Sequence, residues 1–398
     1  MIIGVVGKPN VGKSTFFKAA TLADVEIANY PFATIKPNSG IGFVKIDCAD
    51  KFFNKQCNPR VGYCVKHKRF VPIDVIDVAG VVPGAHEGKG MGLEFLNDLN
   101  QADALIHVID ASGSTNDKGE PVKPGTRDPA EDIKFLEDEL DYWYLGILKK
   151  TWEKFSRAVI QTHEDVPKAL HKQFSGLGSN EDMVKQILRE IGLAEKRLNE
   201  WKEKELMSFA RALRIKTKPM IIAANKFDVP IGAENYKKLR DTFPNLTIVP
   251  CSAESELALR EATKRNLIKY VPGETDFEII GNLSDKQKVA LEFIRERVLK
   301  KNVEGTGVQS VLNSVVLGIL NYIPIFPGGV NNLTDQYGNV MPDCFLLKEG
   351  STALDFAFKL HTDFGKNFIR AIDVKTKRTV GKDHILKSGD VVEIISDK

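Results

Sequence analysis

The first residues that point to chemistry lie in a glycine-rich segment, where positions 7–14 read GKPNVGKS. Gly7 and Gly12 let backbone N–H groups curl around phosphate oxygens, while the Lys13 ammonium reaches the β- and γ-phosphates. The Ser14 hydroxyl is a hard oxygen ligand for Mg²⁺. An apolar strand precedes the segment and a helix follows it, so the sequence predicts a nucleotide-binding P-loop. We expect nucleotide contacts from Gly7, Pro9, Asn10, Val11, Gly12, Lys13, Ser14 and Thr15.

Two further segments contain residue types that handle Mg²⁺ and the γ-phosphate. Positions 77–80 read DVAG after an apolar run, so Asp77 can hold a magnesium-bound water and the Gly80 amide can meet the γ-phosphate. Thr34 is the candidate for the second magnesium hydroxyl. We therefore expect Ser14 and Thr34 to bind Mg²⁺ directly and Asp77 to bind it through water. The expected catalytic residues are Lys13, Thr34 and Gly80.

A third segment has the residues needed to recognise a guanine base. The Asp228 carboxylate can accept hydrogen bonds from guanine N1–H and the 2-amino group, neither of which adenine offers. Asn225 can tie this segment to the P-loop, and the Lys226 stem can lie over the base. A further strand is followed by a segment where a backbone amide can meet the base oxygen. Its residues are Ser252, Ala253 and Glu254.

These residues follow short apolar runs that read as buried parallel strands, with helical segments between them. The runs are Ile2–Val6, Val71–Asp77, Ala104–Asp110, Met220–Asn225 and Thr247–Cys251. The alternation predicts a doubly wound α/β sheet with functional residues at the carboxyl ends of its strands. Together with the motifs above, this sheet is expected to form a P-loop GTPase domain. We expect this domain to comprise residues 1–129 and 218–320.

A helical insertion interrupts the α/β pattern at residues 130–217. Apolar residues recur there at spacings of three and four, which predicts two long helices in an antiparallel, coiled-coil arm. The two series are Ile133, Leu136, Leu140, Trp143 and Ile147, and then Ile187, Ile191, Ala194, Leu198 and Trp201. We expect both tryptophans to serve packing.

The pattern of the remaining segment, residues 321–398, predicts a small α+β module. Tyr322–Val330 contains two prolines and two glycines and reads as a loop, and Asp343–Leu347 reads as a strand. Ser351 or Thr352 is expected to cap a short helix through His361. Further strands are expected at Ile369–Val374 and Val391–Ile395.

These motifs, in this order, resemble the Obg-related GTPases, in particular the YchF-like branch. The resemblance is most specific at 29–38 (NYPFATIKPN) and 77–92 (DVAGVVPGAHEGKGMG). Residues 347–395 are similar to a TGS domain, a resemblance that implies a β-grasp fold. The markers are at 350–352 (GST), 361–363 (HTD) and 389–392 (GDVV). The resemblance implies a GTP-dependent switch. Many YchF-like proteins lack the guanine-reading aspartate and use ATP. A nucleotide-gated binding protein that uses ATP, with incidental hydrolysis, is therefore the alternative. This chain keeps Asp228, which favours GTP.

The sequence lacks a glutamine to orient the attacking water, because Val81 follows Gly80. The Obg resemblance implies that K⁺, held through Asn10, offsets the loss. His86 and Glu87 lie in the following loop and are a second way to position water.

Cysteine and histidine positions leave several readings open. Cys57 and Cys64, with Cys48 and His67 nearby, suggest a metal site, but the spacing fits no standard zinc knuckle. A local disulfide and ordinary reduced thiols are the other two readings, and the sequence favours reduced thiols. His107 alternates with apolar residues and is expected to be a buried sheet residue.

We expect a cytoplasmic, monomeric protein, and the five cysteines of the chain are too few for a disulfide framework. The 398 residues carry 56 Lys or Arg and 53 Asp or Glu, no apolar run is long enough to span a membrane, and no signal peptide is expected. Basic excess is concentrated between Lys149 and Lys218, with 16 basic and 10 acidic residues, while the rest holds 40 and 43. A solvated helical surface or a contact with RNA or the ribosome explains this excess. The expected small-molecule partners are GTP and GDP.

Overall fold

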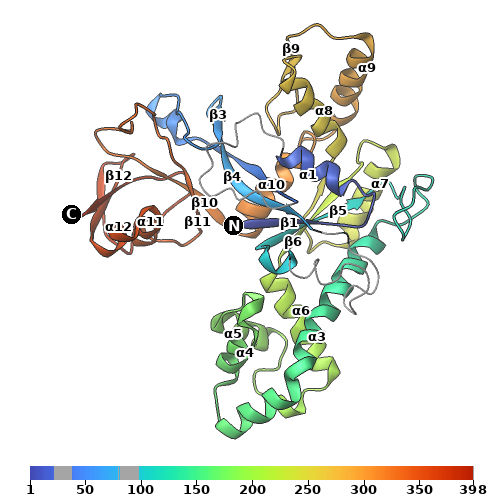
Figure 1. Ribbon diagram of the computed structural model, residues 1–398, viewed down its shortest axis with the longest axis vertical. Coiled ribbons are helices and arrows are strands. Elements are labelled where there is room, and N and C mark those ends of the chain that lie inside the picture. The colour runs from blue at the N-terminus through green and yellow to red at the C-terminus, as the bar shows by residue number, and fades with distance from the viewer. Residues whose placement is uncertain (22–37, 79, 81–97, 398) are drawn as a thin grey trace. The chain divides into compact units, whose positions relative to one another are not determined.

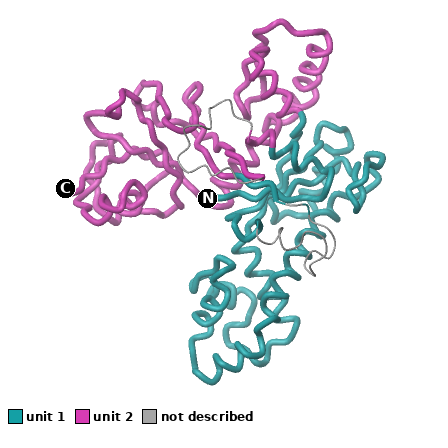
Figure 2. Tube along the Cα trace, viewed as in Figure 1, with its two compact units in different colours: residues 1–17, 75–254 teal, residues 18–74, 255–398 magenta. Residues whose placement is uncertain are grey.

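The computed structural model describes residues 1–21, 38–78, 80 and 98–397. The chain divides into two compact units (Figure 2). Unit 1 comprises residues 1–17 and 75–254, and unit 2 comprises residues 18–74 and 255–398. Each unit is described below by itself.

The strands of unit 1 form the parallel part of a sheet. They are β1 (Ile2–Val6), β5 (Ala104–Asp110), β6 (Met220–Asn225) and β7 (Ile248–Pro250). Each pairs in parallel with the next, and every residue of β5 and β6 is buried. A strand covered on both faces needs apolar side chains on both, which is why the sequence showed continuous apolar runs. Three further strands complete the sheet: β2 (Ser39–Asp47), β3 (Tyr63–Val65) and β4 (Lys68–Asp77). The order is β2-β4-β1-β5-β6-β7, with β3 paired to β4, and the doubly wound α/β prediction is confirmed.

Helices connect these strands. α1 (Lys13–Thr21) follows β1, α7 (Pro230–Thr242) follows β6, and α8 (Ala253–Lys264) follows β7. Pro230 starts α7 because a first-turn residue needs no hydrogen-bonded N–H and proline presets its backbone angle. This strand–helix alternation leaves the carboxyl ends of β1, β5 and β6 at the same edge of the sheet (Figure 1).

The insertion between β5 and β6 forms four helices rather than two (Figure 1). They are α3 (Ala130–Thr162), α4 (Val166–Phe174), α5 (Glu181–Glu190) and α6 (Glu203–Thr217). α3 and α6 pack against each other, and one hydrophobic core runs from the sheet through the helices. Arg214 of α6 and buried Asp141 of α3 form an ion pair at 2.9 Å. The two helices are therefore also joined by buried charges that compensate each other.

The prediction of a second long helix in the insertion is wrong. α5 ends at Glu190, and Gly192 adopts a left-handed backbone with φ of 71°, which turns the chain away from the helix. Leu198 lies in a single 3-10 turn, and Glu205 then caps the start of a new helix through the Lys202 N–H. Trp201 is still buried and stacks on Trp152, so its predicted packing role is confirmed.

Unit 2 contains two antiparallel strand pairs, β3 with β4 and β8 with β9, and several short helices. Its strands here are β2 (Ser39–Asp47), β3 (Tyr63–Val65), most of β4 (Lys68–Asp77), β8 (Ile268–Lys269) and β9 (Glu278–Ile279). Its helices are a 3-10 helix (Ala49–Phe53), α9 (Asp285–Ile294), α10 (Val308–Asn313) and π-helical turns at Arg295–Leu299 and Ser314–Ile319. α10 packs on β2, with Gln309 donating to the Phe43 carbonyl at 2.8 Å.

The last part of unit 2 is a five-stranded mixed sheet with two helices, as the β-grasp prediction requires (Figure 1). Its elements are β10 (Tyr322–Pro327), β11 (Phe345–Lys348), α11 (Ala353–Leu360), α12 (Thr362–Lys366), β12 (Phe368–Asp373), β13 (Arg378–Val380) and β14 (Val391–Ser396). The strand order is β11-β10-β14-β12-β13. Thr352 caps α11 as expected, because its hydroxyl accepts from Asp355 N–H.

One segment of this module differs from the prediction. Residues 322–327 form β10, where a loop was expected. Pro324 does not break the strand, since its carbonyl accepts from Gly389 N–H at 2.8 Å and Ile325 is buried in the module core. In the described part of the chain, no helix combines the length and apolar composition needed to cross a bilayer.

Candidate nucleotide-binding site

The glycine-rich loop lies between β1 and α1, and its backbone conformation depends on glycine. Gly12 has φ of +94°, and a Cβ there would lie 2.2 Å from Asn225 Nδ2. A Cβ on Gly7 would lie 2.5 Å from the Val108 carbonyl oxygen. Any larger residue at either position therefore displaces the loop or its support. The loop ends at the N-terminus of α1, which offers unpaired N–H groups to an anion.

The polar side chains at the start of α1 meet the end of β4. Lys13 Nζ forms an ion pair with Asp77 Oδ1, and Ser14 Oγ lies 3.5 Å from Asp77 Oδ2. A hydroxyl and a carboxylate at this separation are a hard-oxygen donor set that fits Mg²⁺. Gly80 lies beside the loop, since a Cβ added at this position would lie 3.8 Å from the Gly7 carbonyl oxygen.

Several predicted residues have other placements. Val11 is fully buried and faces the protein interior, while Pro9 is exposed and Thr15 is half-buried, so any nucleotide contact from Val11 would be through its backbone. Thr34, Val81, His86 and Glu87 lie outside the described residues.

Asn225 joins three parts of the site. Its Nδ2 donates to the Val11 carbonyl at 2.9 Å, and its Oδ1 accepts from Ala253 N–H at 3.0 Å. The side chain is 4% exposed, so both bonds are shielded from water and stronger for it. The P-loop and the segment after β7 are thus fixed to the end of β6, and Asn225 makes the tie expected from the sequence.

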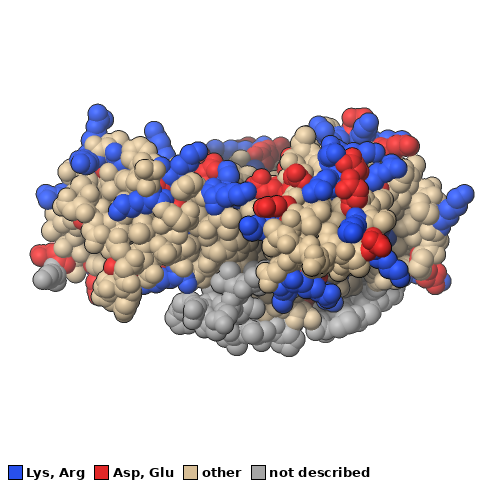
Figure 3. All heavy atoms as spheres, turned by 90° about the horizontal axis from the view of Figure 1, so that it is seen from above, with Lys and Arg blue, Asp and Glu red and all other residues tan. Residues whose placement is uncertain are grey.

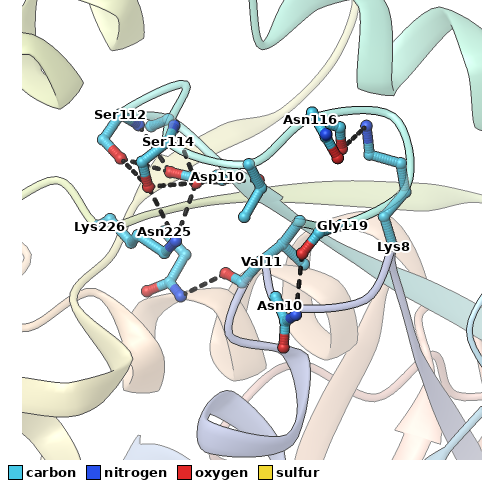
Figure 4. Close-up of polar contacts among 12 residues, drawn as sticks. Lys8, Asn10, Val11, Asp110, Ser112, Ser114, Asn116, Gly119, Asn225 and Lys226 are labelled. Atoms are coloured by element: carbon cyan, nitrogen blue, oxygen red, sulfur yellow. Dashed lines mark hydrogen bonds and ion pairs between the residues drawn. The ribbon is translucent and has the colours of Figure 1, made fainter. Parts of the chain in front are cut away.

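Asp228 and Ser252 lie together at the carboxyl ends of β6 and β7. Ser252 Oγ donates to Asp228 Oδ1 at 2.7 Å, which orients the carboxylate of half-buried Asp228. Glu254 is exposed on the first turn of α8. Lys226 has φ of 60°, and its ammonium lies 2.8 Å from Asp110 Oδ2, so its head group is anchored to the carboxylate at the end of β5 (Figure 4).

Asp110 organises the loop that follows β5, a role that the sequence did not reveal. It is 1% exposed and accepts hydrogen bonds from the Ser112, Ser114 and Thr115 hydroxyls at 2.6, 2.7 and 3.0 Å. Burial alone would raise the pKa of Asp110, but the Lys226 ammonium and these hydroxyls lower the pKa below its usual range. The run of hydroxyl residues two, four and five places after a strand-end aspartate is the signal that sequence analysis missed.

The loop formed by residues 111–129 also holds the P-loop from outside (Figure 4). Asn10 Nδ2 donates to the Gly119 carbonyl at 2.8 Å, and Gly119, with φ of +79°, comes so close that a Cβ would lie 2.8 Å from Pro9. Lys8 forms a buried ion pair with Asp132 at 2.6 Å. The outer side of the P-loop is thereby fixed, and the Asn10 amide oxygen points away from Gly119.

A P-loop, a strand-end aspartate and a guanine-type segment on a doubly wound sheet define the class of P-loop GTPases. Family models agree with that class along the chain. Residues 2–131 match the model described as 50S ribosome-binding GTPase, and residues 223–330 match Obg-like GTPase YGR210-like, G4 motif-containing domain. Residues 333–396 match the TGS domain.

Whole-chain relatives give the family. The chain is 46% identical to an uncharacterized GTP-binding protein, MJ1332, of Methanocaldococcus jannaschii, over 99% of both chains. The crystal structure of a GTP-binding protein from Pyrococcus horikoshii OT3 matches with a TM-score of 0.78 and 38% identity over the whole of both chains. A more distant relative, 27% identical over 98% of this chain and 97% of its own, is the ribosome-binding ATPase YchF of Bacillus subtilis. The chain belongs to the Obg-related P-loop GTPases, in the YchF-like branch with a C-terminal TGS domain.

Proposed function

We propose that this chain is a slow, magnesium-dependent GTPase whose nucleotide state controls its contact with the ribosome or with RNA. One observation carries the choice of GTP: Ser252 orients the Asp228 carboxylate, and Asn225 fixes the same segment to the P-loop. A guanine-reading acceptor is thereby held at a fixed place relative to the phosphate loop. Family membership gives nucleotide hydrolysis as the activity.

Base preference follows from the hydrogen bonds that Asp228 can make. Guanine supplies two N–H donors to the carboxylate, whereas adenine presents an acceptor and leaves the charge unpaired. An unpaired buried polar group costs about 1–3 kcal/mol, and more when it is charged. The alternative is a nucleotide-gated binding protein that uses ATP, and its support is that relatives such as YchF of Bacillus subtilis are named ATPases.

The phosphate end would use the residues at the start of α1. Lys13 is paired with Asp77, so a triphosphate would have to attract the ammonium from that carboxylate. Ser14 and Thr34 would hold Mg²⁺ directly and Asp77 through water, and the ion supplies positive charge beside the β- and γ-phosphates. Lys13 and the Gly80 amide would then stabilise negative charge on the transferred γ-phosphoryl group. The γ-phosphate would also order the loops around Thr34 and Gly80, and hydrolysis would release them.

Water activation would depend on a cation rather than a glutamine. The Asn10 amide nitrogen is engaged by Gly119, and its oxygen is directed away from that loop (Figure 4). An amide oxygen is a suitable ligand for K⁺, so we place the K⁺ of the Obg-type mechanism there. Its charge would offset the apolar residue at position 81.

The partner would be reached through the helical insertion and the TGS-like module. We propose the division expected from the sequence: a GTPase domain at 1–129 and 218–320, the insertion at 130–217 and the TGS-like module at 321–398. Ribosome contact is supported by two similarities: residues 2–131 match a model described as 50S ribosome-binding GTPase, and the relative YchF of Bacillus subtilis is named a ribosome-binding ATPase. We further propose that the chain is monomeric and cytoplasmic.

A titration of GDP and ADP against the wild-type chain in one buffer tests the base assignment. We expect GDP to bind at least about 10²-fold more tightly. Asp228→Asn should weaken GDP binding and shift preference towards xanthine nucleotides, whose 2-oxo group accepts from the new amide. Asp241→Asn, which changes an exposed carboxylate on α7, is the matched control and should bind GDP normally. Equal affinities for GDP and ADP would replace this proposal with the ATP alternative.

Whether hydrolysis serves a switch is a separate question, answered by turnover measured with and without ribosomes. Strong stimulation by ribosomes supports the switch. Absence of turnover in both conditions would support the binding protein.

A further inference from the structure

Four potential metal ligands converge in unit 2, outside the nucleotide-binding site. Cys48 follows β2, Asp50 lies in the 3-10 helix, Cys57 lies in the next loop, and Cys64 lies in β3. One ligand atom from each comes within 4.8 Å of all the others. We call these four residues the thiol cluster. Cys48, Asp50 and Cys57 are buried and Cys64 is half-buried.

Two distances inside the thiol cluster fall within the range of tetrahedral coordination, and the other pairs lie within 4.8 Å. With metal–sulfur bonds of about 2.3 Å and metal–oxygen bonds of about 2.0 Å, ligand atoms on zinc lie roughly 3.5–3.8 Å apart. The Cys48 and Cys57 sulfurs are 3.5 Å apart, and the Cys64 sulfur is 3.8 Å from Asp50 Oδ2. Closing the four atoms around one ion therefore needs only small side-chain movements.

Surrounding groups prepare the ligands for a cation. His67 Nδ1 lies 2.9 Å from Asp50 Oδ1 and Cys57 N–H donates to Oδ2, which orients the carboxylate towards the sulfurs. The Arg69 guanidinium lies 3.5 Å from the Cys57 sulfur, and its positive charge would stabilise a metal-bound thiolate there.

We propose that the thiol cluster is a structural zinc site with three cysteine ligands and one aspartate ligand. A disulfide between Cys48 and Cys57 would use two of the four groups and give no role to Cys64, although its sulfur lies 3.8 Å from the buried Asp50 carboxylate. Inert thiols would leave the convergence of all four unexplained. The sequence favoured reduced thiols because the fourth ligand is an aspartate and the ligands come from three segments, so no standard spacing appears.

The site would stabilise the segment that holds the start of the TGS-like module. Asn58 N–H donates to the Val340 carbonyl at 2.8 Å, and Arg60 N–H donates to the Pro342 carbonyl at 3.1 Å. Buried Arg69 bonds to the Met341 and Pro342 carbonyls at 3.0 and 2.7 Å. All three donors lie within or directly beside the chain that links the thiol cluster, so zinc would fix their positions.

Metal analysis of the full-length chain, purified under reducing conditions without added chelator, tests the proposal. We expect about one zinc per chain by mass spectrometry. Cobalt substitution should give tetrahedral d–d absorption with thiolate-to-cobalt charge-transfer bands. Cys57→Ser should contain at least about tenfold less zinc, and Asp50→Asn should release zinc faster to a chelator. Cys344→Ser, which removes a cysteine outside the cluster, is the matched control and should keep its zinc.

Because Cys57→Ser can fail to fold, the wild-type cobalt spectrum decides the matter independently. Wild-type protein that contains no zinc and gives no thiolate–cobalt bands would overturn the proposal. A Cys48–Cys57 disulfide peptide in the freshly purified, unreduced chain would also overturn it. Loss of zinc in Cys344→Ser would overturn Asp50 as the fourth ligand.

Discussion

Lys13, the residue proposed to bind phosphate, forms an ion pair within the protein. Its ammonium is paired with Asp77, and both side chains retain only a small exposed fraction, 12% and 18%. Neither charge is left uncompensated in a partly buried site, where an unpaired charge would be costly. Under the proposed function, nucleotide binding would exchange one anionic partner of Lys13 for another, and the released Asp77 carboxylate would become available to a magnesium-bound water.

Replacing Lys13 with Ala tests this exchange. The variant loses its positioned cation, so GTP turnover should fall by at least about 10²-fold and nucleotide affinity should also fall. Lys18→Ala removes an exposed cation from the same helix and should leave turnover near the wild-type value. Steady-state phosphate release gives the comparison, and near-normal turnover in the Lys13 variant would remove the P-loop assignment.

Asn10 allows the proposed K⁺ to be tested separately from the loop contact. GTPase rate should rise when K⁺ replaces Na⁺ at constant ionic strength, and Asn10→Ala should abolish the difference because it removes the oxygen ligand. Asn10→Asp loses the donor to Gly119 but keeps an oxygen, so it should retain the K⁺-to-Na⁺ rate ratio. Equal wild-type rates in the two salts would exclude this role of K⁺.

At the scale of elements, β5 carries a titratable group in the sheet core. His107 is 1% exposed, and its Nδ1 has no hydrogen-bond partner among the described residues. Burial, with a smaller effect of the Lys8 ammonium, lowers the pKa of His107 from 6.5 to about 3. The sequence expectation of a buried sheet histidine is confirmed, and it has a consequence for acid stability.

The free energy of unfolding should decrease as the pH falls below 6.5. In the unfolded chain His107 then binds a proton, whereas in the folded chain it stays neutral down to about pH 3. This single group contributes a slope of about 1.4 kcal/mol per pH unit within that window. Urea midpoints measured between about pH 5 and 6.5 isolate it from the carboxylates. His107→Leu should flatten the slope, whereas His163→Asn, at an exposed helix end, should not. An unchanged slope in the Leu variant would contradict the assignment.

The elements differ in how clearly the sequence predicts them. β1, β5 and β6 have the predicted bounds because strands buried on both faces leave continuous apolar runs. β2 was missed because its glycines and lysine hide a strand whose partners are distant in the chain. β10 was taken for a loop because of its prolines, although Pro324 needs only its carbonyl there.

The site divides in the same way. The Asn225 tie to Val11 follows from motif order, because each motif has a fixed role on this fold. The Asp110 hydroxyl network and the Lys8–Asp132 ion pair belong to no motif, and the latter joins residues far apart in the chain. Only the folded sheet brings such partners together, so local spacing contains no sign of them.

At the scale of the whole molecule, the distribution of charge decides how an RNA contact can be tested. The face drawn in Figure 3 carries Lys and Arg side chains interspersed with Asp and Glu, without one continuous basic patch. Within the helical insertion, part of the basic excess is already used in ion pairs. Lys196 bonds to Glu205 at 2.7 Å, and Glu205 in turn caps α6, so a change at Lys196 would disturb the fold.

The proposed contact between the insertion and RNA is best tested through Arg197, Lys202 and Lys204, which are all exposed. Affinity for ribosomes should fall steeply with salt if these side chains neutralise phosphates. Replacing all three with Ala should lower the log–log slope by about 2, since each lost contact removes roughly 0.7–0.9. Neutralising Lys237, Lys238 and Arg240 on α7 changes the net charge equally and should leave the slope unchanged. A slope that falls equally in both triple variants would show a general charge effect. A slope that is unaffected by the insertion variant would instead place the contact elsewhere, with the TGS-like module as the next surface to test.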